Sequence, residues 1–176
     1  MTDLAARLDR LESRNAIHDL ASTYMRGLDR LDLSLTRSVF HDDATTDYGE
    51  GWRGDVDGFI AFAHEVLSRH AANHHMIGQV RIEFEGDDLA FGEVYFQAFH
   101  RVEEEGEPKD FFVAGRYVDR YERRSGVWKI AHRSELVDWV RTEPAADEIL
   151  SRQPGFPMGT RAPQDLSCRR AELRTR

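Results

Sequence analysis

The hydrophobic pattern of the chain changes character once, close to His74. Before that point, apolar residues recur every three, four or six positions across residues 3–28, at Leu4, Leu8, Leu11, Ile17, Leu20, Tyr24 and Leu28. This spacing predicts one face of a long helix. Residues 32–40 fit a short second helix, and residues 55–69 carry the wide apolar stripe of a third. Residues 44–48 between them predict a short strand.

After His74 the chain is rich in β-branched and aromatic residues. Four such segments, at residues 77–84, 91–99, 111–121 and 127–140, predict long strands. They are separated by short polar turns, so neighbouring strands are expected to pair antiparallel. Helices followed by a run of strands predict an α+β fold. We expect a cone in which a strongly curved, mixed or mainly antiparallel sheet folds over the N-terminal helices, with a mouth that takes a small apolar ligand.

The length of the chain and the distribution of proline indicate one domain and a tail. A chain of 176 residues suffices for one substantial core, and no flexible stretch divides it into two halves. Residues 1–140 are therefore assigned to the cone domain. Residues 141–176 hold four of the five prolines and little periodicity, so we expect a tail that caps the pocket, contacts a neighbouring subunit or stays mobile.

Charge and cysteine content limit the classes of binding partner and the cellular compartment that we expect. The formal net charge is -8 and the basic residues are scattered among acidic ones, which argues against nucleic acid and anionic membranes as partners. Charged residues interrupt the N-terminal segment, and no stretch has the length of a transmembrane helix. Cys168 is the only cysteine, which excludes an internal disulfide and fits a reducing cytoplasm.

The first candidate for chemistry is His75, which follows His74 at the entrance to the first long strand. Imidazole exchanges protons near neutral pH, so His75 is a candidate general base. Asp29, at the end of the long first helix, is its candidate partner, because a carboxylate orients an imidazole and favours the imidazolium. The plainer alternatives are a surface or core histidine, and an aspartate paired with Arg26 or Arg30 at a solvated helix end.

Three further residues are candidates around the same site. Tyr24 lies five positions before Asp29, about 140° around an ideal helix, and converges on the site only if the last turn unwinds. Tyr48 can donate a hydrogen bond to a substrate oxygen. Arg133 lies late in the last strand, where a buried cation requires a carboxylate or a substrate oxygen. Core packing for the tyrosines and surface exposure for Arg133 are the alternatives.

The sequence gives little support for metal binding, nucleophilic hydrolysis or nucleotide binding. His70 and His74 are four residues apart beside His75, a spacing that suggests a metal, but the glutamate of a zinc-protease motif is missing. There is no nucleophile elbow, and Cys168 lies in the tail. Glycine loops for phosphates or dinucleotides are also missing. We therefore expect no metal and no cofactor.

Several motifs together resemble a known family. These are residues 11–20 (LESRNAIHDL), 27–29 (GLD), 115–124 (GRYVDRYERR) and 126–133 (GVWKIAHR). They look like the SnoaL-like, scytalone dehydratase-like branch of the nuclear transport factor 2-like superfamily, over about residues 4–140. Within that branch the chain resembles scytalone dehydratase, hexachlorocyclohexane dehydrochlorinase and bile acid 7-alpha-dehydratase.

The resemblance implies a function and an assembly. It implies a cofactor-free lyase in which a dyad of His75 and Asp29 promotes β-elimination on a hydrophobic, ring-containing substrate, with Tyr24, Tyr48 and Arg133 in the site. It also implies a homo-oligomer, with a trimer as the expected form. Two alternatives share this fold: a non-catalytic β subunit of a ring-hydroxylating dioxygenase, and a polyketide cyclase or ligand-binding protein.

Overall fold

The computed structural model describes residues 3–175, and its N-terminal part contains the three predicted helices. They are α1 (Leu4–Arg30), α2 (Leu33–Ser38) and α3 (Val56–Ser68). Asp3, Asp32 and Asp55 cap their N-termini by accepting a backbone N–H. Leu31 ends α1 in the left-handed conformation. Gly27 allows α2 to approach α1, since a Cβ there would lie 2.2 Å from the hydroxyl oxygen of Thr36.

The strands form one six-stranded sheet in the order β2-β1-β6-β5-β4-β3. They are β1 (Phe40–Asp47), β2 (Arg53–Asp55), β3 (Ala72–Phe84), β4 (Leu89–Glu104), β5 (Glu107–Arg124) and β6 (Val127–Pro144). The four long strands pair antiparallel, whereas β1 runs parallel to β6. The sheet is therefore mixed and open, and the predicted curved α+β fold is confirmed. The three-residue strand β2 was not predicted because it is too short to show an alternating pattern.

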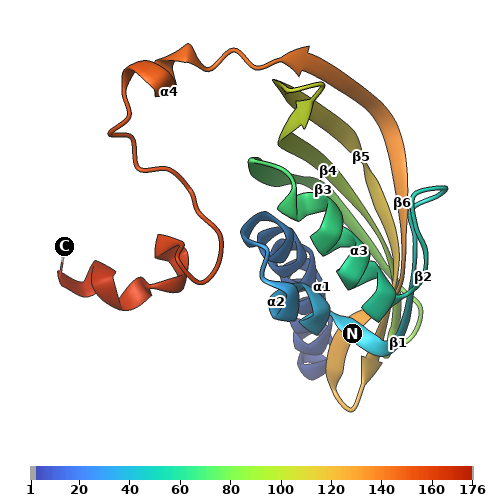
Figure 1. The fold of residues 1–176 in the computed structure, drawn as a ribbon. Coiled ribbons are helices and arrows are strands. Elements are labelled where there is room, and N and C mark those ends of the chain that lie inside the picture. Colours follow the sequence, from blue (N-terminus) through green and yellow to red (C-terminus); the bar gives the residue numbers. More distant parts are fainter. Residues whose placement is uncertain (1–2, 176) are drawn as a thin grey trace.

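The sheet curves around the helices, which lie on its inner face (Figure 1). Shifts in strand register between Ile77 and Val80, and between Ala114 and Gly115, mark irregularities of the kind that bend a sheet. Buried apolar side chains from the helices and from the inner face form one core, which includes Ile17, Tyr24, Phe40, Phe59, Val94, Phe96, Tyr117 and Tyr121. The inner face is the surface on which we expect chemistry.

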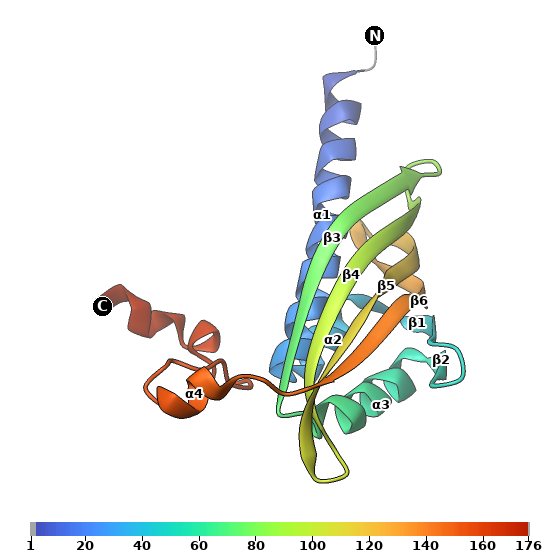
Figure 2. The same cartoon turned by 90° about the horizontal axis from the view of Figure 1, so that it is seen from above.

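The first turns of α1 extend past this core (Figure 2). Leu4, Leu8 and Leu11, which were predicted to lie on the apolar face of the helix, are 74%, 53% and 60% exposed. Burial begins farther along, at Ser13 and Ile17. The apolar pattern therefore predicts the helix correctly. The apolar side chains of its first three turns, however, are exposed in the described chain.

The C-terminal segment leaves the sheet and returns to the end of α1. After β6 it contains α4 (Glu148–Arg152) and two 3-10 helices, η1 (Leu166–Cys168) and η2 (Arg170–Thr175). The backbone N–H of Ala162 donates to the carbonyl oxygen of Arg30 at 2.8 Å, and the Arg30 side chain pairs with Asp165. Among residues 3–175, no helix is both long and apolar enough to cross a membrane.

Candidate active site

Asp29 and His75 meet on the inner face of the sheet. The Nδ1 atom of His75 lies 2.7 Å from a carboxylate oxygen of Asp29, and the backbone N–H of His75 donates to both carboxylate oxygens at 3.1 Å. The His75 side chain is only 5% exposed. Because a carboxylate only accepts hydrogen bonds, Nδ1 carries the hydrogen, and Nε2 of the neutral ring is left to accept a proton. A histidine that acts as a general base requires an orienting partner of this kind.

The fold brings these two residues together from 46 positions apart. Asp29 occupies the last turn of α1, which remains helical through Arg30. The side chain of His75 points inward from β3, opposite Ala98 of β4. The alternative pairing of Asp29 with neighbouring arginines does not occur, since Arg26 binds Ser167 and Arg30 binds Asp165.

Two further histidines, His70 and His100, lie near the pair of Asp29 and His75. His100 lies with its ring 5.2 Å from that of His75, and both His70 and His100 donate from Nδ1 to the amide oxygen of Asn73 at 2.8 Å. Burial, together with the nearby imidazoles, lowers the pKa of His100 to about 3, so this ring is neutral near pH 7. The sequence prediction missed His100, although its alternation with Phe96 and Ala98 along β4 marks it as inward-facing.

Tyr24, Tyr48 and Arg133 form a separate cluster on the inner side. The hydroxyls of Tyr24 and Tyr48 lie 2.7 Å apart, and the guanidinium of Arg133 lies 4.2 Å from the ring centres of both Tyr24 and Tyr117. Burial raises the pKa of Tyr24 to about 12 against the opposing charge of Arg133. No hydrogen bond or ring contact between described residues joins this cluster to His75. The structure thus assembles the five predicted residues as a pair and a trio.

Arg133 is fully buried and has a carboxylate partner. Its Nε and Nη2 atoms donate to the two oxygens of Asp119 at 2.8 and 2.7 Å, and both side chains are 0% exposed. Burial opposes the charge of Arg133, but Asp119 outweighs it and holds the pKa of the guanidinium well above its usual value. Asp119 lies in the motif at residues 115–124, yet only the pairing of β5 with β6 identifies it as the partner.

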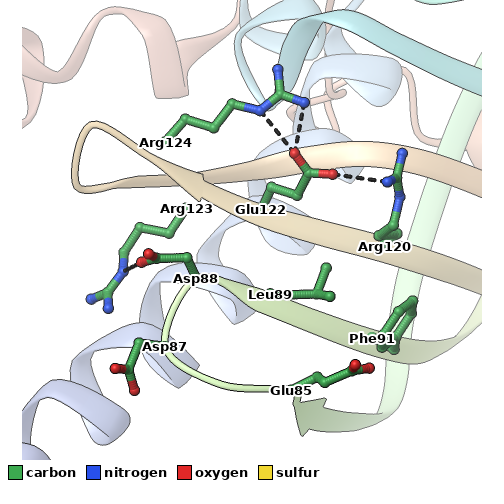
Figure 3. A pocket seen from close by; sticks show the side chains of 9 residues that line it. All are labelled: Glu85, Asp87, Asp88, Leu89, Phe91, Arg120, Glu122, Arg123 and Arg124. Atoms are coloured by element: carbon green, nitrogen blue, oxygen red, sulfur yellow. Dashed lines mark hydrogen bonds and ion pairs between the residues drawn. The ribbon is translucent and has the colours of Figure 1, made fainter.

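The hollow in Figure 3 is distant from the dyad along the sheet. It lies where β3 ends and β4 begins, at the opposite end of β3 from His75, and it is broad and open. Its charges neutralise one another: Glu122 pairs with Arg120 and Arg124, and Arg123 pairs with Asp88. We assign no chemistry to it. The closed apolar pocket that the family resemblance implies remains a prediction.

His70 and His75 both lie near the ring of His100, at 5.0 and 5.2 Å between ring centres. His74 is exposed and packs near the ring of Phe99, while His70 binds Asn73. Within residues 3–175, no group of three or more His, Cys, Asp or Glu side chains is placed to hold a metal ion.

Comparison with known proteins gives the family. The model of the SnoaL-like domain matches residues 9–134. The chain belongs to the SnoaL-like family. A curated relative, hexachlorocyclohexane dehydrochlorinase 1 of Sphingobium indicum, is 32% identical to this SnoaL-like protein over 126 residues, which is 70% of this chain and 80% of the relative.

Solved structures agree with this assignment. A type 2 hexachlorocyclohexane dehydrochlorinase superposes with a TM-score of 0.72 at 28% identity, covering 80% of this chain and 94% of the other. A putative scytalone dehydratase from Novosphingobium aromaticivorans shares the fold, with a TM-score of 0.69 at 19% identity, covering 78% and 92%. Dehydrochlorinases are elimination enzymes, and the similarity to them supports a lyase here.

Proposed function

We propose that this SnoaL-like enzyme is a cofactor-independent lyase of the dehydratase type, which catalyses β-elimination on a hydrophobic, ring-containing substrate. The observation that carries the proposal is the hydrogen bond between Asp29 and the buried His75. Nε2 of His75 removes a proton that a neighbouring carbonyl or similar group has made acidic. Asp29 holds the ring in the required tautomer and stabilises the imidazolium that forms.

The second cluster is assigned to the leaving group. Tyr48 is partly exposed, and its hydroxyl meets that of the buried Tyr24. Arg133 carries a positive charge 4.2 Å from the ring centre of Tyr24, and this charge also acts on Tyr48. A hydrogen bond from a tyrosine and the field of the guanidinium stabilise negative charge that develops on a departing oxygen. The aromatic lining supports a ring-containing substrate.

The two alternative functions use the site differently. An assembly subunit of an oxygenase has no need of an oriented histidine, and the similarity to dehydrochlorinases does not favour that role. A cyclase would form a carbon-carbon bond, whereas a binding protein would leave its ligand unchanged. Product analysis by mass spectrometry and NMR distinguishes them, since only a lyase is expected to remove water or hydrogen chloride without forming a new carbon-carbon ring bond.

The dyad is tested by substitution, after hydroxylated and chlorinated ring ketones have been screened for elimination. We expect His75→Ala to lower kcat by about 100- to 10,000-fold, because general base catalysis is lost. Asp29→Asn is expected to lower kcat by about 100-fold or more, because the amide can hold the wrong tautomer. Steady-state kinetics with folding checked by circular dichroism is the measurement.

His74→Ala is the matched control, since His74 is the adjacent residue but is exposed. We expect it to retain wild-type turnover. Full activity in folded His75→Ala or Asp29→Asn would refute the dyad.

We also propose a homotrimer located in the cytoplasm. The exposed apolar residues of α1 and of the outer sheet face support self-association. Sedimentation equilibrium should then give three times the chain mass of 20.3 kDa, and fractionation of the source cells should recover the enzyme with cytoplasmic markers.

A further inference from the structure

Glu135 is an acidic residue on the inner face that the mechanism above does not use. It lies two positions after Arg133 on β6, so both side chains point to the same side of the sheet. Its neighbour across the strand pair is Tyr117 of β5, whose ring packs against Tyr24. The Glu135 side chain is only partly exposed. The fold therefore adds a carboxyl group to the cluster of tyrosines and Arg133.

Titratable and charged side chains face Glu135 from α1, from the end of β1, from β5 and from its own strand β6. Arg133 acts on it from its own strand, while Tyr24 of α1, Tyr48 after β1 and Tyr117 of β5 all sense its charge. Burial raises the pKa of Glu135 to about 7 even though Arg133 opposes the shift. Asp119 already neutralises much of the charge of Arg133, which explains why burial prevails.

Two polar groups of this cluster have no partner. The Nη1 atom of Arg133 is buried and, within residues 3–175, meets no hydrogen-bond acceptor. Glu135 makes no hydrogen bond or ion pair with any described residue. Buried polar groups are normally paired, and an exception asks for an explanation. The buried Nη1 donor and the partly exposed carboxyl group of Glu135 lie in the same cluster as Tyr48 and are the groups there that an oxygen atom of a substrate would pair with.

We infer that Glu135 is the acid that protonates a leaving hydroxyl, so that the substrate of this enzyme is a β-hydroxy ring compound that loses water. This inference rests on the proposed elimination and names its leaving group. Arg133 and Tyr48 donate hydrogen bonds to the departing oxygen, and Glu135 supplies the proton.

The elimination conserves atoms and electrons. Nε2 of His75 takes the proton, the electrons of the C–H bond form the carbon-carbon double bond, and the C–O bond breaks toward oxygen. That oxygen takes the carboxyl proton of Glu135 and leaves as water. The products are the unsaturated compound, an imidazolium and a carboxylate. One proton returned through solvent from His75 to Glu135 restores the enzyme.

The tyrosines are weaker candidates for this proton. The pKa of Tyr24 is about 12, and burial raises that of Tyr48 well above its usual value. A proton donor works best when its pKa lies near the operating pH. A tyrosine here gives a hydrogen bond, whereas the Glu135 carboxyl can give up its proton near pH 7.

The base and the acid flank the same curved surface. His75 faces inward from β3 and Glu135 from β6, with β4 and β5 between them. Adjacent strands lie about 4.8 Å apart, so three steps across a flat sheet give roughly 14 Å between backbones. Strand register places Glu135 level with Val80 of β3, five residues beyond His75, which adds about 16 Å along the strands. The sheet curves around the helices (Figure 1), so two inward side chains approach each other more closely than on a flat sheet.

The leaving group separates this inference from the proposed function. Chloride departs as an anion and needs no proton, whereas hydroxide is a poor leaving group unless it is protonated. The probes are 3-hydroxycyclohexanone and 3-chlorocyclohexanone, because loss of water or of hydrogen chloride gives the same absorbing product, 2-cyclohexenone. With Glu135→Gln we expect the rate of water loss to fall about 100-fold more than that of chloride loss.

The pH profile gives a second readout. In the wild type, water loss should decline above about pH 7 as Glu135 ionises, and this alkaline limb should disappear in Glu135→Gln. Asp138→Asn is the matched control, since it removes a carboxyl from the same strand that pairs instead with Arg116 at the surface. It should alter neither the ratio nor the profile.

The outcomes distinguish the two proposals. If the wild type releases water and Glu135→Gln releases it equally fast with the same pH profile, the role of Glu135 is wrong and the elimination stands. If the wild type is no faster than His75→Ala with either probe, the elimination falls and this inference with it. Carbon-13 NMR of labelled glutamate needs no substrate: a carboxyl midpoint near 7, absent from Glu135→Gln, is expected, and midpoints that all lie near 4 to 5 would overturn the assignment.

Discussion

Arg133 shows how one buried charge organises its surroundings. Its guanidinium lies 4.2 Å from the ring centres of both Tyr24 and Tyr117, and two of its nitrogens donate to Asp119. Tyr121 donates a third hydrogen bond to the same carboxylate at 2.6 Å. A buried ion pair adds little to stability compared with apolar residues of equal size, but the loss of one partner leaves an uncompensated charge. The pair is therefore expected to fix the position of the arginine.

Asp119→Asn should lower the free energy of unfolding by about 3 to 5 kcal/mol, because it leaves Arg133 buried without a counter-charge. Urea unfolding followed by circular dichroism measures the change. Glu65→Gln is the control, since it breaks an ion pair with Arg69 in which both side chains are about 70% exposed, and should cost less than about 1 kcal/mol. Equal losses in the two variants would show that the aromatic rings, and not Asp119, hold the guanidinium.

Between elements, the end of α1 is held by a residue outside the matched family domain. Arg161 donates to the backbone carbonyl of Asp29 at 2.6 Å and to that of His70 at 3.1 Å. It thus ties the last turn of α1 to the segment that leads into β3. Because Asp29 and His75 belong to these two elements, we expect Arg161 to act as a positioning residue for the proposed dyad.

Arg161→Ala should lower kcat about 10-fold or more with a smaller change in KM, since a small misplacement of a catalytic group is costly. It should also shift the downfield proton NMR signal of the His75 Nδ1–H. Arg170→Ala is the control, because Arg170 bonds to Ser167 within the tail. An unchanged His75 signal and unchanged kcat in Arg161→Ala would remove the positioning role.

Across the whole molecule, apolar side chains gather on surfaces that the chain itself does not cover. The outer face of the sheet carries Tyr95, Phe99 and Trp139, which are 39%, 42% and 51% exposed. The ring of Phe112 lies between those of Phe99 and Trp139, with 4.6 and 4.8 Å between ring centres. Contiguous exposed aromatic residues of this kind are typical of a protein interface.

Trp139→Glu should therefore weaken the proposed trimer and yield smaller species in sedimentation, because a charge would be desolvated at the interface. Glu83→Arg, at an exposed position of β3, is the control and should leave the mass unchanged. A wild type that sediments as a single chain at micromolar concentration would contradict the proposed trimer.

Local patterns predicted the fold well and the site partly. The periods of three to four and of two residues follow from helix and strand geometry, so the three helices and four long strands were predicted from sequence. Strand β2 and the parallel pairing of β1 with β6 were not, because neither leaves a periodic signal. Among the site residues, Asp29 and His75 were selected by chemistry and by family resemblance. Asp119, His100 and Glu135 were not, because each acquires its partners only through strand pairing.

The sequence alone determined where the three N-terminal helices and the four long strands lie and which side chains are able to move a proton near neutral pH. These are local properties, set by backbone geometry and by the chemistry of each side chain. Tertiary structure decided which groups meet and what burial does to them. Burial raises the pKa of Glu135 to about 7 against the opposing charge of Arg133, and burial together with the nearby imidazoles lowers that of His100 to about 3, because folding removes water from these groups and fixes their neighbours.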